Sequence, residues 1–144
     1  MKYTDKLVVK ALDFAREAHK GQLYGKEDYF LAHISKVVTN LLVNGESNMA
    51  QIVGALHDIF EDTGNLYTDK VATLFGEEVY LNLWELTRRK GEQYFSYIKR
   101  INSPVAKKVK IEDVTCNYRA SVLIRDDKRM GRYAKALLIL LGYD

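Results

Sequence analysis

The segment 54–63, Gly-Ala-Leu-His-Asp-Ile-Phe-Glu-Asp-Thr, places one imidazole and three carboxylates within six residues of an otherwise apolar run. Residues three and four apart share a face of an α-helix. On one continuous helix, His57 would therefore lie above Glu61, and Asp58 above both Glu61 and Asp62. Three acids and an imidazole beside apolar neighbours resist burial unless a cation compensates them. The spacing therefore predicts a divalent metal site.

Glu61 and Asp62 lie one turn beyond the His-Asp pair. A metal ion acidifies bound water so that the water becomes a nucleophile near neutral pH. Two carboxylates at this distance could orient that water or carry its proton. The alternative interpretation is a solvated helix end, with Thr63-Gly64 as its stop. Acids at a helix C-terminus oppose the helix dipole, however, and such a local conflict is typical of functional sites.

The chain contains three histidines, His19, His33 and His57, and each falls on or at the end of an inward-facing helical stripe. A single core histidine is usually structural, and for His19 that interpretation and a functional one stay equally open. Two imidazoles and two carboxylates would suit Mn²⁺, Fe²⁺ or Zn²⁺. Cys116 is expected to be a small buried hydrophobic residue.

The elements that must position these residues are predicted to be helices throughout. Apolar residues recur at three- and four-residue spacing, and there is a single proline. We expect an all-α fold, one compact helical domain over residues 1–144, with a polar loop over 22–28. The caps Thr4, Ser47 and Ser103-Pro104 mark three helix starts. The expected helices, about eight in number, cover 4–19, 30–43, 47–63, 68–75, 77–87, 94–101, 103–119 and 127–141.

The amino-acid composition restricts the classes to which this protein could belong. The 144 residues are 47% apolar and 28% charged, as in globular proteins. The apolar run 136–141 falls far short of the ~20 residues that span a bilayer, and the N-terminus lacks the apolar core of a signal peptide. One cysteine suits a reducing cytosol, so we expect a cytoplasmic protein. A net charge of +3 does not indicate nucleic-acid binding.

Four segments, 18–22, 29–33, 55–63 and 109–117, together resemble the hydrolase domain of RelA/SpoT-type proteins. They read Ala-His-Lys-Gly-Gln, Tyr-x-x-x-His, Ala-Leu-His-Asp-x-x-Glu-Asp-Thr and Val-Lys-Ile-x-Asp-x-x-x-Asn. This domain is one of the HD-domain metal-dependent phosphohydrolases, and its single-domain members are the small alarmone hydrolases and the Mesh1-type enzymes. The resemblance covers about residues 4–140.

The resemblance implies the removal of a 3′-pyrophosphate from guanosine tetra- or pentaphosphate, (p)ppGpp, with Mn²⁺ the usual ion. Some relatives instead remove the 2′-phosphate of NADPH. A small phosphorylated nucleotide is thus the expected partner. By this resemblance the metal ligands would be His33, His57, Asp58 and Asp113, and the catalytic acids would be Glu61 and Asp62. Asn117 would lie near the nucleoside. His19 and Gln22 would form the turn that supports the pocket.

The chain departs from the family pattern at the loop that follows Gln22. Tyr24-Gly25 stands where guanine-binding members have Arg-Lys, and Asp28 stands where they have proline. Tyr24 could stack on a base instead. Among the cations, Lys110 and Arg119 are the expected phosphate contacts, because Lys110 lies one turn before Asp113 and Arg119 lies near Asn117 on the same segment. Two alternatives remain: an HD hydrolase for another nucleotide, such as an NADPH phosphatase or nucleotidase, and a non-catalytic nucleotide sensor.

Overall fold

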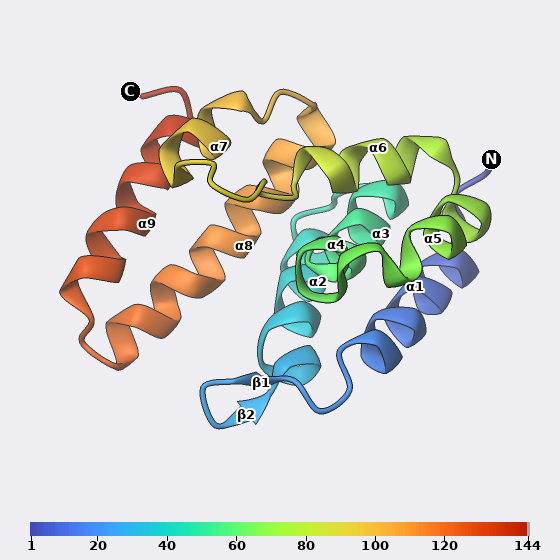
Figure 1. Cartoon of the computed structure of the whole chain (residues 1–144), viewed down its shortest axis with the longest axis horizontal. Coiled ribbons are helices and arrows are strands. Elements are labelled where there is room, and N and C mark those ends of the chain that lie inside the picture. Colours follow the sequence, from blue (N-terminus) through green and yellow to red (C-terminus); the bar gives the residue numbers. More distant parts are fainter. Residues whose placement is uncertain (144) are drawn as a thin grey trace.

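The computed structural model describes residues 1–143 and confirms the all-α prediction. The only strands in this part of the chain are β1 (Leu23–Tyr24) and β2 (Glu27–Asp28), which pair antiparallel within the loop expected over 22–28. A π-helical turn spans Phe30–Ile34 and a 3₁₀ turn Gly64–Tyr67. The helices are α1 (Asp5–Ala18), α2 (Ser35–Val43), α3 (Asn48–Leu56), α4 (Ile59–Thr63), α5 (Thr68–Phe75), α6 (Glu77–Glu85), α7 (Tyr94–Arg100), α8 (Pro104–Leu123) and α9 (Asp127–Leu140) (Figure 1).

The three helix starts identified from capping residues are present. The side-chain oxygens of Thr4, Ser47 and Ser103 each accept a hydrogen bond from the backbone N–H three residues on. Pro104 occupies the first position of α8, where its missing N–H costs no helical bond. Local chemistry therefore sets where α1, α3 and α8 begin.

The prediction of one continuous helix over 47–63 was wrong. α3 ends at Leu56 and α4 begins at Ile59, with Asp58 at φ −102° and ψ 0° between them. In an unbroken helix, successive side chains point about 100° apart. The break relieves this restriction and lets His57 and Asp58 turn toward one point. The expected placement of His57 directly above Glu61 is lost with the continuous helix.

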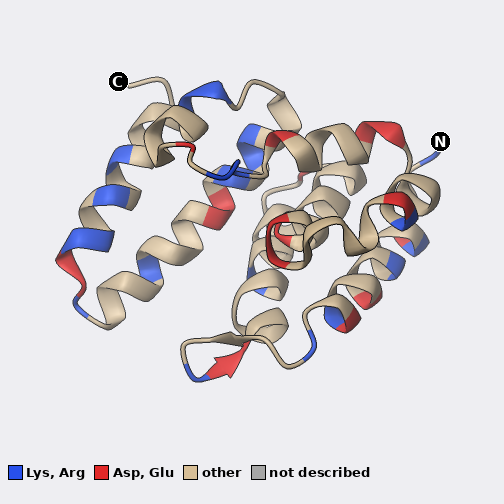
Figure 2. Cartoon of the chain, viewed as in Figure 1, with Lys and Arg blue, Asp and Glu red and all other residues tan. Residues whose placement is uncertain are grey.

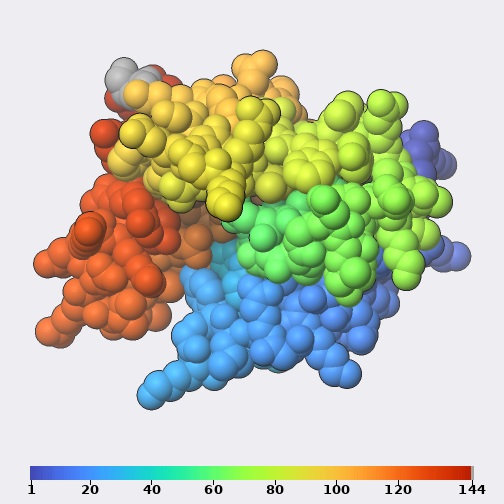
Figure 3. Space-filling view, in the orientation of Figure 1, coloured from blue at the N-terminus to red at the C-terminus, as the bar shows by residue number. Residues whose placement is uncertain are grey.

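α3 is the central element of the fold. Every residue from Ala50 to Leu56 is buried, and α3 packs against α1, α2, α6 and α8. α8 and α9 form a long antiparallel hairpin beside this core (Figure 1). In Figure 3 a recess separates this hairpin from the β1–β2 pair. Within residues 1–143 no helix combines the length and the apolar character needed to cross a bilayer.

Charge is distributed unevenly along the chain. Residues 118–144 contain six Lys or Arg and three Asp or Glu, which accounts for the whole net charge of +3. Figure 2 shows the basic residues in bands along α9. The preceding 117 residues carry equal numbers of positive and negative side chains.

Gly54 allows α2 to approach α3 closely. A Cβ added there would lie 2.5 Å from Cδ1 of Leu41, which is buried, whereas a Cβ at Gly131 of α9 would meet nothing within 4 Å. Gly54→Ala should therefore lower the free energy of unfolding by about 1 kcal/mol, because overpacking exceeds the gain in helix propensity. The matched control Gly131→Ala should raise it by about 0.5–1 kcal/mol. Chemical denaturation measures both, and equal stabilisation would contradict the close approach.

Candidate metal centre

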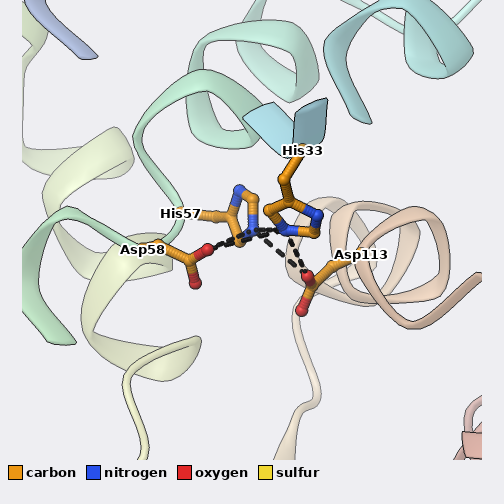
Figure 4. A group of neighbouring side chains, drawn as sticks. All are labelled: His33, His57, Asp58 and Asp113. Carbon is orange, nitrogen blue, oxygen red and sulfur yellow. Dashed lines mark hydrogen bonds and ion pairs between the residues drawn. The ribbon is translucent and has the colours of Figure 1, made fainter. Parts of the chain in front are cut away.

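The structure brings the four predicted metal ligands together. His33 comes from the π turn, His57 and Asp58 from the break between α3 and α4, and Asp113 from the middle of α8. One potential ligand atom from each lies within 4.8 Å of the others (Figure 4). Both histidines and Asp113 are buried. Residues 80 positions apart in the chain thus form one polar cluster inside an apolar core.

Both imidazoles turn Nε2 toward the centre of the cluster. His33 Nε2 lies 2.9 Å from Asp113 Oδ1, His57 Nε2 lies 3.1 Å from Asp58 Oδ2, and the two Nε2 atoms are 3.3 Å apart. At the far side of its ring, His57 Nδ1 donates to the carbonyl of Gly54 at 2.6 Å. That bond fixes the ring so that Nε2 is the nitrogen facing inward, which is the ring orientation of metal-bound histidines.

The charges of the cluster also fit a cation. Burial disfavours protonated His33, but the hydrogen bonds to Asp113 and Cys116 and the nearby carboxylate charges together outweigh burial and raise the pKa of His33 to about 9. Burial likewise disfavours ionised Asp58, yet the charge of His57, its hydrogen bond and the charge of His33 together outweigh burial and lower the pKa of Asp58. The cluster thus favours a positive charge between the carboxylates of Asp58 and Asp113. Two nitrogens and two carboxylate oxygens are a suitable donor set for Mn²⁺, Fe²⁺ or Zn²⁺.

Tyr29 holds Asp58 in place, a role that the sequence did not reveal. Its hydroxyl donates to Asp58 Oδ2. Burial, with the adjacent Asp58 charge, raises the pKa of Tyr29, so the phenol stays protonated and remains a donor. The available signal was its spacing, because Tyr29 lies one helical turn before His33 in a motif already noted.

The two acids of α4 lie beside the cluster and each has a fixed partner. Glu61 Oε1 accepts from the backbone N–H of Arg88 at 2.8 Å, and Asp62 Oδ2 accepts from Gln22 Nε2 at 2.9 Å. Burial raises the pKa of both carboxyls toward neutrality. A group whose pKa is moved in this direction is better suited to receive and return a proton near neutral pH.

His19 supports Gln22 from behind. Its Nδ1 lies 2.8 Å from Gln22 Oε1, which orients the amide so that Nε2 faces Asp62. His19 is 1% exposed, and its own Nε2 has no hydrogen-bond partner among the described residues. His19 thus contacts Asp62 mainly through Gln22, and its Nδ1 also lies 3.8 Å from Asp62 Oδ2.

The loop that contacts Glu61 is held by an ion pair. Arg100 donates to both carboxylate oxygens of Glu92, at 2.6 and 2.9 Å, and Glu92 in turn fixes the backbone of Arg89 and the side chain of Arg88. These bonds place the Arg88 N–H against Glu61. Nothing in the local sequence predicts that Arg100 reaches back to Glu92.

A cavity of about 670 Å³ lies next to the metal centre, bordered by β1, β2, α2, α8 and α9. Three of the residues expected to contact substrate line it: Tyr24, Asn117 and Arg119. The Tyr24 ring stacks on His33 with centroids 5.0 Å apart, and its hydroxyl donates to Asn117 Oδ1 at 2.6 Å. Tyr24 and Asn117 thus lie between the cavity and the four candidate ligands, where they contact His33 and Asp113.

The fourth expected substrate contact, Lys110, is not a lining residue of this cavity. Its Nζ lies 2.8 Å from Asp113 Oδ2 instead. Cys116 is buried as expected, and its Sγ lies 3.3 Å from His33 Nδ1. It therefore contacts His33 without belonging to the group of four.

Comparison with known structures supports the fold. The chain is similar over its full length to the solved structure of a metazoan ortholog of SpoT that hydrolyzes ppGpp and plays a role in starvation responses. The two share 24% sequence identity with a TM-score of 0.77, and the match covers 100% of this chain and 90% of the other. No family model matches the chain. At this identity, the likeness shows a shared all-α fold.

A divalent ion that binds the four-residue centre should stabilise the folded protein. At a concentration near 100 times its dissociation constant, Mn²⁺ should raise the melting temperature by roughly 5–10 °C, and a chelator should reverse the shift. His57→Ala should abolish the shift because it removes a ligand atom. His19→Ala, which alters a buried histidine outside the centre, should retain it. An equal shift in both variants would place the ion elsewhere.

The Arg100–Glu92 pair should contribute stability that depends on pH. The hydrogen bonds from Arg100 lower the pKa of Glu92 from an ordinary 4.5 to about 2. The contribution is therefore complete above pH 4.5 and is lost as pH falls toward 2. Glu92→Gln should lower the melting temperature by roughly 3 °C at pH 7, and less at pH 3. A difference from wild type that stays constant over this range would rule out the ionised pair.

Proposed function

We propose that the chain is a metal-dependent phosphohydrolase of the HD type, similar to the RelA/SpoT-type hydrolases, that acts on a phosphorylated nucleotide. The supporting observation is the buried centre of His33, His57, Asp58 and Asp113 in the fold of a protein that hydrolyzes ppGpp. The first substrate we propose is ppGpp, cleaved at its 3′-pyrophosphate. Mn²⁺ is the proposed ion, with Fe²⁺ and Zn²⁺ as alternatives from the same donor set.

In this proposal the four ligands hold a divalent ion that would act as a Lewis acid toward water and phosphate. Glu61 and Asp62 orient the attacking water and take up its proton. Their positions support these roles, because each carboxylate keeps one fixed partner and a pKa raised by burial. The bonds from Arg88 and Gln22 keep the two acids from turning away toward solvent.

The cavity is the proposed site of the nucleoside. Tyr24 and Tyr133 supply aromatic surface, and Arg119 and Lys36 supply positive charge at its lining. Aromatic rings stack on bases of any sequence, and guanidinium groups bind phosphate through paired donors. Asn117 has both amide atoms committed, one to Tyr24 and one to Asp113, so it would contact a ligand only after exchanging one of these bonds.

Tyr24 also favours a second candidate substrate. A tyrosine in place of the family's basic pair alters the surface that a base would meet, so cleavage of another nucleotide, such as the 2′-phosphate of NADPH, is the alternative we propose. A purely sensing protein is less well supported, because a sensor has no need to hold Glu61 and Asp62 beside the metal centre. We further propose that residues 1–144 act as one domain in the cytoplasm, without nucleic-acid or membrane partners.

Phosphate release tests this function. The protein loaded with Mn²⁺ should cleave at least one of ppGpp, NADPH, a deoxynucleoside triphosphate and a cyclic nucleotide. If ppGpp is not cleaved while another of these nucleotides is, ppGpp is excluded as the substrate, but the assignment as a hydrolase stands. Tight nucleotide binding with no release from any of the four would identify a sensor and contradict the enzyme.

Two variants separate metal binding from proton transfer. Asp58→Ala should abolish both Mn²⁺ binding and turnover, since it removes a ligand. Glu61→Gln should retain the Mn²⁺-dependent shift in melting temperature but lose about 10²–10⁴-fold in kcat, because the amide cannot take up a proton. Full activity in Asp58→Ala on the substrate that proves to be cleaved would exclude the mechanism.

A further inference from the structure

The two oxygens of Asp113 face different partners. Oδ1 points to the other metal ligands, at 2.9 Å from His33 Nε2 and 3.3 Å from His57 Nε2. It also accepts from Asn117 Nδ2 at 3.3 Å. Oδ2 lies on the opposite side, 2.8 Å from Nζ of Lys110. The carboxylate is thus divided between the metal centre and an ammonium group.

Lys110 is itself held firmly in this position. It precedes Asp113 by three residues on α8, so the two side chains leave the same face of the helix. Its side chain is only 12% exposed, and its Nζ lies 4.8 Å above the ring of Tyr97. Tyr97 is 2% exposed and is fixed by a hydrogen bond from its hydroxyl to the carbonyl of Leu86. A buried aromatic face and a carboxylate together favour the charged amine.

We propose that Lys110 is a positioning residue that occupies Oδ2 of Asp113, so that this carboxylate offers only Oδ1 to a metal ion. A free carboxylate can bind a metal ion through one oxygen or through both. Holding one oxygen keeps a coordination position available for water and substrate. The proposal rests on the metal-dependent chemistry proposed above.

The same contacts argue against the role that the sequence suggested for Lys110, a direct contact with a substrate phosphate. To reach a phosphate, Nζ would have to leave both Asp113 and the Tyr97 ring. Its departure would also leave Asp58 and Asp113 ionised and close together without the nearest fixed cation. Removing one charge from a buried ion pair leaves the other charge without a partner, and this costs free energy of folding.

Three substitutions and a control separate these roles. Lys110→Met removes the donor and the charge, Lys110→Gln keeps a donor without charge, and Lys110→Arg keeps both. Lys108→Met is the matched control, because it also removes a lysine–carboxylate pair from α8, the exposed pair with Glu46 at 2.8 Å. Mn²⁺ is the probe, followed by calorimetric titration and by its electron paramagnetic resonance spectrum in the absence of nucleotide.

In Lys110→Met we expect Mn²⁺ to bind at least as tightly as in wild type, because the lost ammonium competed with the ion for Asp113. The Mn²⁺ spectrum should change as Oδ2 becomes a second ligand atom. On whichever substrate is cleaved, kcat should fall by about 10–100-fold, with KM changed less. Lys110→Gln and Lys110→Arg should restore the spectrum, and Lys108→Met should match wild type in every measurement.

Two results would overturn the proposal. Weaker Mn²⁺ binding in Lys110→Met, by tenfold or more, would mean that Lys110 keeps Asp113 available as a ligand rather than limiting it. An unchanged spectrum with a raised KM would identify a phosphate contact. Should Lys110→Met fail to fold, the spectra of Lys110→Gln and Lys110→Arg decide, and a spectrum unlike that of wild type in both contradicts the role. The binding and spectral measurements need no turnover, so they stand even if the proposed substrates are not cleaved.

Discussion

Two carboxylates and two imidazoles meet in the interior of an apolar fold, and their need for compensating charge governs much of the surrounding structure. Each acid of the pair Asp58 and Asp113 has its own donor, the Tyr29 hydroxyl for the first and the Lys110 ammonium for the second. The ammonium occupies Oδ2 of Asp113 and leaves Oδ1 facing the histidines, whereas the phenol donates to the same Oδ2 of Asp58 that faces His57. Buried charge is tolerated where partners are placed so closely, and the partners explain why polar residues interrupt the otherwise apolar faces of the helices.

α8 shows how one helix serves several of these needs. Lys110, Asp113 and Asn117 follow at three- and four-residue intervals, so they share a face that crosses the centre of the molecule. Hydrogen bonds join them in series, and Asn117 extends the series to Tyr24 in the loop before the π turn. The geometry of the proposed metal ligands is thereby connected to the wall of the adjacent cavity, where a nucleotide is proposed to bind.

The features that depend on local chemistry could be predicted from the sequence. Helix caps such as Thr4 and Ser47 act on backbone groups three residues away, and apolar spacing reports the buried face of each helix. The break at His57-Asp58 could not be predicted from the sequence, because the apolar pattern continues unaltered through α3 and α4. The π turn that carries His33 closes its backbone hydrogen bonds over one residue more than an α-helix does, too small a difference for periodicity to reveal over five residues. Glu92 and Arg100 pair only because the loop folds back, which no local pattern encodes.

The uneven distribution of charge affects how a ligand arrives. Because the whole net positive charge belongs to residues 118–144, the α8–α9 hairpin borders the cavity with a positive field while the rest of the molecule is balanced. Such a field attracts anions over distances of about one Debye length, roughly 8 Å at physiological salt. We therefore expect a multiply charged anion to be drawn toward this side of the molecule. Its rate of encounter falls as ionic strength rises, while its rate of departure depends on the contacts made inside.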